Sequence, residues 1–374
     1  MSAVEIVPVN DGHGLNRFIA FPYQHYRSDP LWVPQLRMDV RTLLSQKKNP
    51  FWQHATAQFF IGRAPSGARG RTVGRIAAIK NDAHNQTWND RVGFYGFFES
   101  IDDQAVANGL FDAAAGWLRQ QGLNTMRGPA SPSLNDECGL LVEGFDTPPT
   151  LMMPHNQSYY VRLTERAGFH KAKDLICYQS MGTDMPERLV RGAKLVAERK
   201  GITLRGLNLK RFGEEVETIK RLYNAAWERN WGTVPLTDAE IDHLAKQLKP
   251  IVVPELIVFA EMRGETIGFA VSLPDFNVAL KHNPSGRLYG LPLILWHARK
   301  ISRLRILLLG ALKEYRHTGV DALMYAWIWE KGTAKGFRWG EGGWVLEDNA
   351  AMVNGMLRLG FRPYKTYRIY DRPL

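Results

Sequence analysis

The stretch ERAGFHKAKDLICY (Glu165–Tyr178) returns in altered form near the end of the chain as RLGFRPYKTYRIY (Arg358–Tyr370). The Gly-Phe pair and the closing tyrosine of one stretch each lie 192 positions from their counterparts in the other. In a second pair of stretches, GRTVGRIAAIKNDAHN (Gly70–Asn85) and RGETIGFAVSLPDFN (Arg263–Asn277), the central glycines lie 194 positions apart. Nearly equal offsets, close to half of the 374 residues, indicate a duplicated domain.

Both halves predict the same order of secondary-structure elements. Alternating β-branched and aromatic residues around glycine-containing turns predict a hairpin at 57–80 in the first half and at 254–273 in the second. A further strand and an amphipathic helix follow each hairpin, at 92–122 and at 305–336. In each half, a strand and helices precede the hairpin, and a strand, a helix and a last strand pair follow the amphipathic helix. This order of elements predicts an α/β fold. We expect each half to be a mixed sheet flanked by helices.

The length and the cysteine content agree with a two-domain protein of a reducing compartment. We expect one domain at 1–185 and the other at 190–374. Cys138 and Cys177 form no CxxC motif, which excludes a disulfide framework and a cysteine-type zinc site. The N-terminus lacks the charged and apolar regions of a signal peptide, and the apolar runs are too short to span a membrane. We therefore expect a cytoplasmic protein.

The net charge of +11 is compatible with nucleic acid, a membrane surface or a polyanionic ligand, and also with a basic solvated surface. The cations are spread along the chain, and no helix-turn-helix or zinc-finger pattern is present, so we expect no nucleic-acid partner. The sequence contains no GxxxxGK[ST], HExxH or GxSxG motif, and its histidines are widely spaced. We predict no metal site.

The second half carries a pattern suited to phosphate binding within its strand–loop–helix region 306–324. Backbone N–H groups at a helix N-terminus bind pyrophosphate, and a glycine lets the backbone approach it closely. Further along, Asn349 precedes the pair Gly360-Phe361 by eleven and twelve positions. The loop reads Arg316-His317-Thr318-Gly319-Val320-Asp321 and is followed by Ala322.

The element order and these two motifs resemble the GNAT superfamily of N-acyltransferases, and the chain looks like a tandem of two such domains. The resemblance implies an acyl-CoA donor bound by the second domain, with its pyrophosphate on the loop and its pantetheine amides along the splayed strand 306–310. Backbone N–H groups of that strand would also stabilise the oxyanion. The implied cofactor-binding residues are Leu308, Leu309, Gly310, Arg316, His317, Thr318, Gly319, Val320, Asp321, Ala322 and Asn349.

Some positions depart from the family's pattern. Asp321 stands where a small residue is expected and would place an acid near the phosphates. The alternative is that it points outward and interacts with the helix dipole. Met356 replaces a tyrosine that in the family often protonates the leaving thiolate, and a methionine also suits a core position. In the first half, Glu99, Asp102 and Asp103 occupy the corresponding loop and would repel phosphate. We expect the first domain not to bind CoA and to help form the acceptor cleft.

N-acyl transfer needs a group that takes a proton from the amine. Asp275, with Asn277 beside it at the end of the second hairpin, is the first candidate base; the alternative is that Pro274–Asn277 is only a turn. Glu347, at the end of a predicted strand, is a further catalytic candidate. The alternative for that segment is helix capping by Asp348 or Asn349.

Two groups of polar residues are candidates for binding the acceptor. Asn230 and Trp231 follow a predicted helix where the family places acceptor-binding loops, although an indole also suits a packed loop anchor. In the first half, a polar cluster stands in apolar sequence, and its histidine has the alternative of a hydrogen-bonded structural role. The cluster consists of Asn135, Glu137, His155 and Asn156.

The segments FPYQHYRSDPLWVPQL (21–36) and SPSLNDECGLLVEGFDTPP (131–149) look like a group of bacterial tandem-GNAT proteins. Some related acyltransferases are suggested to acylate long-chain amino alcohols in ceramide synthesis. The resemblance therefore implies an acyl-CoA-dependent N-acyltransferase with a small-molecule or lipid-like amine as acceptor. Two other functions stay open: a catalytically silent acyl-CoA-binding protein, and a Fem-type aminoacyl- or peptidyl-transferase with a tRNA-borne donor.

A long insertion separates the second hairpin from the phosphate-binding strand. It joins an apolar block, Leu291–Trp296, to the cations Arg299, Lys300, Arg303 and Arg305. One interpretation is a helix packed on the sheet with a solvated basic edge. The other is a lid or a peripheral contact with the inner face of the membrane, for which we expect weak, salt-sensitive binding to anionic lipid. The alternative to membrane contact is that these cations surround the entrance to the CoA site and steer phosphates to it. No oligomeric state is predicted.

Overall fold

The structure is a computed structural model that describes residues 4–64, 70–182, 185–227, 231–316 and 318–374. Two predicted site residues, Asn230 and His317, lie outside these ranges. Tertiary contacts divide the chain into two units, each assembled from separate stretches of sequence. Unit 1 consists of Met1–Leu175, Leu280–Leu295 and Lys365–Leu374, and unit 2 consists of Ile176–Ala279 and Trp296–Tyr364.

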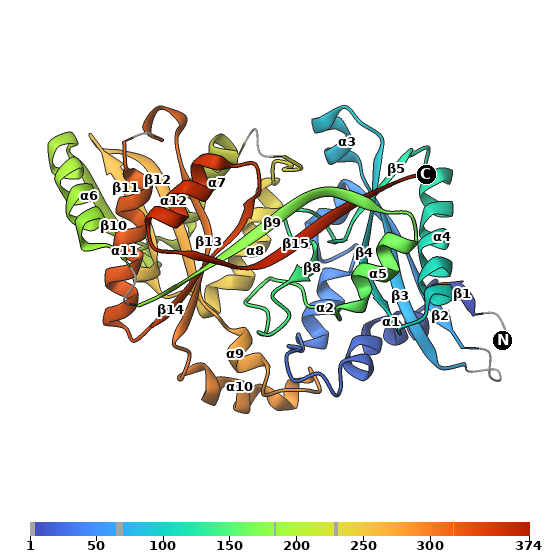
Figure 1. Ribbon diagram of the computed structural model, residues 1–374. Helices are drawn as coiled ribbons and strands as arrows, with labels where there is room; N and C mark the ends of the chain where they lie inside the picture. The colour runs from blue at the N-terminus through green and yellow to red at the C-terminus, as the bar shows by residue number, and fades with distance from the viewer. Residues whose placement is uncertain (1–3, 65–69, 183–184, 228–230, 317) are drawn as a thin grey trace. The chain divides into compact units, whose positions relative to one another are not determined.

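Unit 1 is built on a mixed sheet that contains the first predicted hairpin, β2 (Ala55–Arg63) and β3 (Thr72–Asn81) (Figure 1). The other strands of this sheet in unit 1 are β1 (Glu5–Pro8), β4 (Val92–Ser100), β5 (Thr125–Gly128) and β8 (Leu140–Glu143). Two short strands, β6 (Ala130–Ser131) and β7 (Glu137–Cys138), form a separate antiparallel pair. Its helices are α1 (Gly12–His25), α2 (Arg37–Leu43), α3 (Asp82–Trp88), α4 (Gln104–Gln120) and α5 (Tyr159–Arg166). The pairs from β1 to β4 are antiparallel, whereas β4 and β5 run parallel.

The sheet of unit 1 is covered on both faces because successive residues of a strand point to opposite sides. Phe60 of β2 packs in a core with α4, to which Val106 and Leu110 belong. The next residue, Ile61, packs in a second core with Phe18 of α1. The alternation of β2 thus assigns α4 to one face and α1 to the other.

Unit 2 has a similar mixed sheet, in which β10 to β13 are successively antiparallel and β13 and β14 are parallel. Val258 and Ala260 share a core with helices α6 and α11, while Phe259 between them points to the opposite face. The strands are β10 (Ile202–Gly206), β11 (Ile257–Met262), β12 (Glu265–Pro274), β13 (Arg303–Ala311) and β14 (Trp339–Leu346). The helices are α6 (Glu187–Lys200), α7 (Phe212–Trp227), α8 (Asp238–Leu248), α9 (Asn277–Leu280), α11 (Val320–Ala334) and α12 (Ala350–Arg358), and α10 (Leu291–Ala298) begins in the sequence of unit 1 and ends in that of unit 2.

The Gly-Phe pair of the sequence repeat has the same structural role in both units. Gly168 follows α5 and Gly360 follows α12, with φ angles of 87° and 84° that glycine adopts without a steric cost. Phe169 and Phe361 are buried directly after them. Each pair thereby ends a helix and anchors the start of a long strand, β9 (His170–Met181) or β15 (Arg362–Pro373).

These two long strands each contribute to both units. The last residues of β9 belong to unit 2, where β9 is the neighbour of β14. Residues 365–373 of β15 belong to unit 1 and pair antiparallel with β5, from Tyr370 opposite Gly128 to Pro373 opposite Thr125. Each unit thus contains a strand segment from the other half of the sequence repeat.

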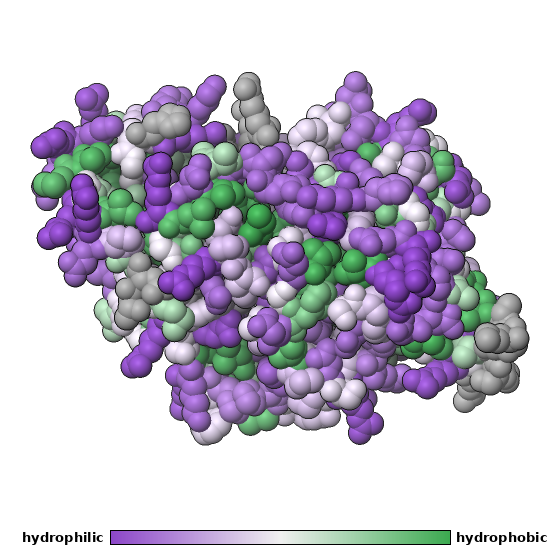
Figure 2. Space-filling model, viewed as in Figure 1, coloured by the Kyte–Doolittle hydropathy of each residue, from purple (hydrophilic) through white to green (hydrophobic). Residues whose placement is uncertain are grey.

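Hydrophilic residues cover most of the face shown in Figure 2. Within the described residues, no helix combines the length and the apolar character needed to cross a bilayer.

Candidate functional site

The parallel strands β13 and β14 separate part-way along their length. Their register begins with Arg303 opposite Trp339 and ends with Ile306 opposite Gly342. β13 continues along β12, so residues 308–310 have a neighbouring strand on one edge only within the part of the chain that the structure describes. We call this separation the fork. A half-buried open strand edge can hold an extended ligand by backbone hydrogen bonds, as an added strand would.

The loop at the far end of β13 leads into α11 without a side-chain cap. Gly319 stands at the N-terminus of this helix with a φ of 80°, and no side chain of a described residue caps it. The hydroxyl of Thr318 donates to the carbonyl of Tyr315 at 2.6 Å, and Arg316 is exposed. Unpaired N–H groups, the helix dipole and a nearby cation form the kind of site that binds phosphate.

The corresponding place in unit 1 is filled by the chain itself. At the N-terminus of α4, the carboxylate of Asp103 accepts hydrogen bonds from the N–H groups of Ala105, at 2.8 Å, and Val106, at 3.4 Å. Along β4, the backbone N–H of Phe97 donates to the hydroxyl of Ser131 in β6 at 2.9 Å, and a Cβ on Gly96 would lie 1.8 Å from the carbonyl oxygen of Ala130. Among the residues that the structure describes, unit 1 therefore lacks both the open helix end and the open strand edge of unit 2.

Three of the predicted cofactor-binding residues have identifiable structural roles. Val320 is buried in the core of unit 2. Asp321 is exposed in the first turn of α11, where a carboxylate interacts favourably with the helix dipole. Asn349 caps α12 by accepting a hydrogen bond from the N–H of Met352 at 3.1 Å. For Asn349 the capping alternative is therefore present in the structure.

The predicted catalytic residues are not brought together. Asp275 is buried just after β12, where its N–H donates to the carbonyl of Arg303 at 2.9 Å and its carboxylate lies 3.6 Å from Nε of that arginine. Because Arg303 begins β13, Asp275 lies at the opposite end of this strand from the loop at 316–319. Asn277 begins α9 close by in sequence. Glu347 is exposed just after β14, and the parallel pairing places this end of β14 on the side of the loop.

A buried ion pair next to the fork was not singled out from the sequence. Arg305 and Glu341 face each other across β13 and β14, one position before the last pair, and their side chains are 4% and 1% exposed. Nε of Arg305 lies 3.2 Å from Glu341, and the guanidinium also donates to the carbonyl of Gly343 at 3.1 Å. The hydroxyl of Tyr364 donates to the other carboxylate oxygen of Glu341. Separating buried charges is costly, so this pair fixes the point where the strands part.

The burial of Arg305 corrects one expectation. The sequence places it among the cations of the insertion's surface, which is wrong because its guanidinium is enclosed with Glu341. One feature of the sequence indicates this burial. Arg305 stands between two apolar residues, Leu304 and Ile306, which are also buried in the strand.

An apolar pocket in unit 2 lies between the sheet and α11 and adjoins the fork. Ile306, the last residue of β13 before the fork, forms part of its wall, and Phe361 from the repeat forms another part. Leu304 and Ile306 of β13 both line the pocket. Arg305 stands between them, so its side chain points to the other face of the sheet. The pocket is lined by Met185, Leu304, Ile306, Tyr325, Ile328, Trp329, Gly332, Thr333, Phe337, Trp339, Gly340 and Phe361.

A buried phenol lies beside Met356, the residue that stands in place of the family's tyrosine. The hydroxyl of Tyr325 on α11 lies 3.2 Å from Sδ of Met356. Met356 in turn packs against Gly342 at the fork, where an added Cβ would lie 2.2 Å from its methyl carbon. Burial, with a smaller contribution from Asp321, raises the pKa of Tyr325, so its hydroxyl stays protonated at neutral pH.

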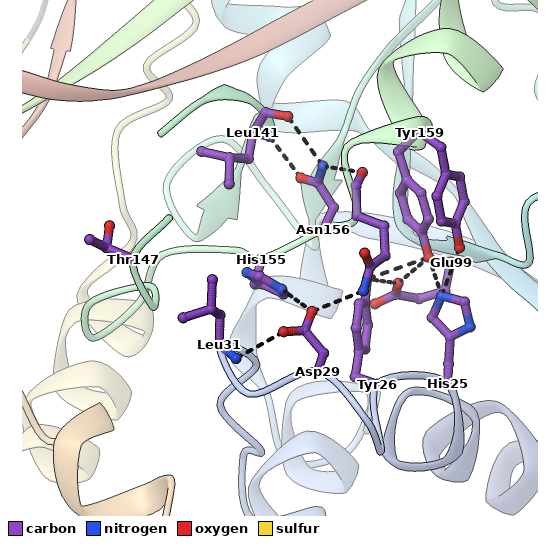
Figure 3. A network of polar contacts seen from close by, with 12 residues as sticks. His25, Tyr26, Asp29, Leu31, Glu99, Leu141, Thr147, His155, Asn156 and Tyr159 are labelled. Atoms are coloured by element: carbon purple, nitrogen blue, oxygen red, sulfur yellow. Dashed lines mark hydrogen bonds and ion pairs between the residues drawn. The ribbon is translucent and has the colours of Figure 1, made fainter. Parts of the chain in front are cut away.

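The two acceptor candidates of unit 1 that are adjacent in sequence are held by the protein itself (Figure 3). The side-chain amide of Asn156 accepts from the N–H of Leu141 at 2.7 Å and donates to the carbonyl of the same residue at 3.2 Å. Nε2 of His155 lies 2.7 Å from a carboxylate oxygen of Asp29. Burial lowers the pKa of His155, which favours a neutral imidazole that donates to Asp29.

The remaining acceptor candidates also have partners or lie elsewhere. The backbone N–H of Asn135 donates to the hydroxyl of Ser133 at 3.1 Å, and the side chain of Gln35 donates to Glu137 at 2.5 Å. Trp231 is half-buried and belongs to unit 2, so the structure does not group it in one unit with the other candidates. Their role in acceptor binding stays a prediction.

A buried polar network in unit 1 surrounds Glu99. The sequence placed this acid in the loop that corresponds to the loop at 316–322, but it lies within β4. Glu99 accepts hydrogen bonds from the hydroxyls of Tyr26, at 2.5 Å, and Tyr160, at 2.8 Å, and lies 3.5 Å from Arg75. Nε2 of His25 lies 3.0 Å from the hydroxyl of Tyr160. The carboxylate thus ties the end of β4 to α1 and α5.

Burial controls the protonation of this network. It raises the pKa of Glu99, against the opposing effect of Arg75. Burial, assisted by the positive charge of Arg75, lowers the pKa of His25 to about 4. His25 is therefore neutral at physiological pH.

Comparison with known proteins shows the family to which the chain belongs. No family model matches it. The chain is 37% identical over 381 residues to a bacterial ceramide synthase from Caulobacter vibrioides, with 99% of this chain and 98% of that protein covered. It is 34% identical over 372 residues to the protein YghO of Escherichia coli, with 96% and 93% covered. The chain belongs to the family of these two proteins.

Solved structures show that this chain has the fold of tandem GNAT proteins. A tandem GNAT protein from the clavulanic acid biosynthesis pathway superposes with a TM-score of 0.58 at 13% identity, covering 99% of this chain and 98% of its own. A GCN5-related glucosamine N-acetyltransferase region of a fungal β-N-acetylglucosaminidase has a TM-score of 0.59 at 14% identity and covers the whole chain, with 38% of its own length. The predicted α/β fold of two GNAT-like domains is confirmed.

Proposed function

We propose that the protein is an acyl-CoA-dependent N-acyltransferase that carries out its reaction at the fork in unit 2. The observation that carries this proposal is the combination of an open β13 edge with an uncapped helix N-terminus at the end of the same strand. Unit 1 has neither feature. The GNAT fold and the ceramide synthase among the relatives support acyl transfer to nitrogen.

The acyl donor would bind along β13. Its pyrophosphate would lie on the loop and first turn at 316–322, where Arg316 adds a positive charge. Its pantetheine amides would pair with the backbone of residues 308–310. The acyl chain would extend into the apolar pocket, which reaches the fork at Ile306 and accepts hydrocarbon without burying polar groups.

In the reaction, the neutral amine attacks the thioester carbonyl, a C–N bond forms and the C–S bond breaks. Asp275 is our candidate for the group that takes the proton from the incoming ammonium, because it lies at the end of β13 opposite the phosphate-binding loop. Backbone N–H groups of 306–310 would stabilise the oxyanion. Tyr325 is our candidate for donating a proton to the leaving thiolate. Arg305 and Glu341 act as positioning residues that hold the fork.

The ceramide synthase relative favours a long-chain amino alcohol as the acceptor. Its amine would be the nucleophile, and its hydrocarbon tail would be the part that the enzyme must shield from water.

The test is to incubate the purified chain with a long-chain acyl-CoA and sphinganine and to follow the N-acylated product by mass spectrometry, with release of free thiol in equal amount. Glucosamine serves as a polar acceptor control. Binding of acyl-CoA without amide formation on any amine would instead identify a silent binding protein. Transfer from charged tRNA, with no reaction from acyl-CoA, would identify a Fem-type enzyme.

A further inference from the structure

The segment 281–300 contains α10, which Figure 1 labels. It exposes an unusual number of large apolar side chains. Of thirteen exposed large apolar side chains among the described residues, six lie in this short stretch. Tyr289 is 73%, Leu295 63% and Trp296 52% exposed, whereas Ile294 is buried and anchors the helix. The six are Leu288, Tyr289, Leu291, Leu293, Leu295 and Trp296. Soluble proteins keep such groups of exposed apolar side chains small unless they bind something.

The charged residues within this segment are all of one sign. No acidic residue stands between Asp275 and Glu314. Four cations of the segment are exposed, and one of them, Lys300, lies with its Nζ 3.6 Å from the centre of the Trp296 ring. The four are Lys281, Arg287, Arg299 and Lys300. Arg303 does not belong to this set because it lies partly buried beside Asp275.

We propose that segment 281–300 docks on the surface of an anionic membrane. Apolar side chains and cations side by side gain both from insertion at the headgroup boundary and from attraction to anionic lipid. A second copy of the chain is the less favourable occupant, because two segments that carry only positive charge repel each other. With eight residues, α10 is too short to span a bilayer and suits the interface.

This docking surface is independent of the proposed acyl transfer, since none of its residues belongs to the fork, the loop or the apolar pocket. It would deliver a lipid-like substrate from the membrane, but its own test uses no substrate.

The test is co-sedimentation of the full chain with phosphatidylcholine vesicles, with and without phosphatidylglycerol. We expect binding only with phosphatidylglycerol, and weaker binding as salt is raised. The triple variant Arg287→Gln, Arg299→Gln and Lys300→Gln should lower the partition coefficient by on the order of 10²-fold or more. The double variant Leu295→Ser and Trp296→Ser should also release the protein.

Matched variants on other exposed surfaces separate this segment from general charge and hydrophobicity. Arg188→Gln, Arg199→Gln and Lys200→Gln remove three exposed cations from α6, and Leu195→Ser with Leu209→Ser removes two exposed leucines. Both controls should bind vesicles like the wild type. The proposal is wrong if the wild type stays in the supernatant at low salt, or if the controls lose as much binding as the segment variants. A dimer in sedimentation velocity that Leu295→Ser and Trp296→Ser dissolves would assign the patch to a second copy instead.

Discussion

Among single residues, Gly319 has the most direct influence on the proposed donor site. Its φ of 80° is strained for any residue with a Cβ, at a cost of about 1–2 kcal/mol, and a branched side chain would keep the backbone away from a phosphate. We expect Gly319→Val to abolish acyl-CoA binding in calorimetry. Gly336 ends the same helix with a φ of 89°, so Gly336→Val carries a similar strain without touching the loop. Equal affinity in the two variants would contradict the assignment.

Asp275 tests the proton transfer. If it is the base, Asp275→Asn should lower kcat by on the order of 10²-fold while acyl-CoA affinity stays nearly constant. The measurement is steady-state kinetics together with donor titration, and a thermal melt shows whether the buried contact with Arg303 was needed for folding. A full rate in a stable variant would return Asp275 to the role of a turn residue.

His25 predicts how stability depends on pH. Its pKa of about 4 in the folded protein lies below the ordinary value of about 6.5, so the unfolded chain binds more protons between these values. The free energy of unfolding should therefore fall as pH is lowered from about 6.5 to about 4, by at most about 3 kcal/mol from this group. In urea unfolding at pH 7 and pH 5, His25→Gln should lose less stability than the wild type. The variant His13→Gln, which replaces an exposed histidine of the same helix, is the control, and an unchanged loss in His25→Gln would refute the account.

At the scale of elements, local periodicity was enough to predict the hairpins and α11. The Gly-Phe repeat also pointed to real structure, because a left-handed glycine and a buried aromatic residue are local requirements. The course of β9 and β15 was not predictable, since the choice of a partner strand depends on contacts far apart in sequence.

The site residues also divide into those that a contiguous sequence pattern predicts and those that depend on contacts between distant segments. The loop at 316–322 has a contiguous pattern, so its place before the N-terminus of α11 could be predicted, whereas its binding of phosphate stays a prediction. Capping by Asn349 was one of the alternatives that the sequence left open. The pairing of Arg305 with Glu341 could not be, because register between β13 and β14 decides it. The burial of a charged side chain can be predicted only once its oppositely charged partner is known.

The apolar pocket gives an element-level prediction about the donor. A Cβ on Gly332 of α11 would lie 3.1 Å from Leu304, so the larger Gly332→Leu side chain would fill the pocket. We expect kcat/KM for a long-chain acyl-CoA to fall by about tenfold more than that for acetyl-CoA. Gly355→Leu on α12, where an added Cβ meets nothing within 4 Å, is the matched control. An equal loss for both donors in Gly332→Leu would exclude the pocket as the acyl-chain site.

For the whole molecule, the two units show how a duplicated fold diverges. Unit 1 closes its helix N-terminus with Asp103 and lays β6 against β4, while unit 2 keeps both places open. Glu99 and its buried tyrosines then stabilise the closed unit from within. We therefore propose that the duplication leaves one donor site in a chain that contains the fold twice.

Calorimetric titration of the full chain with a long-chain acyl-CoA tests this claim most directly. The account predicts one site per chain, with binding lost in Arg316→Glu and retained in Arg162→Glu, which reverses an exposed cation near the closed loop of unit 1. Two equivalent sites per chain, or an Arg316→Glu variant that binds as tightly as the wild type, would contradict it.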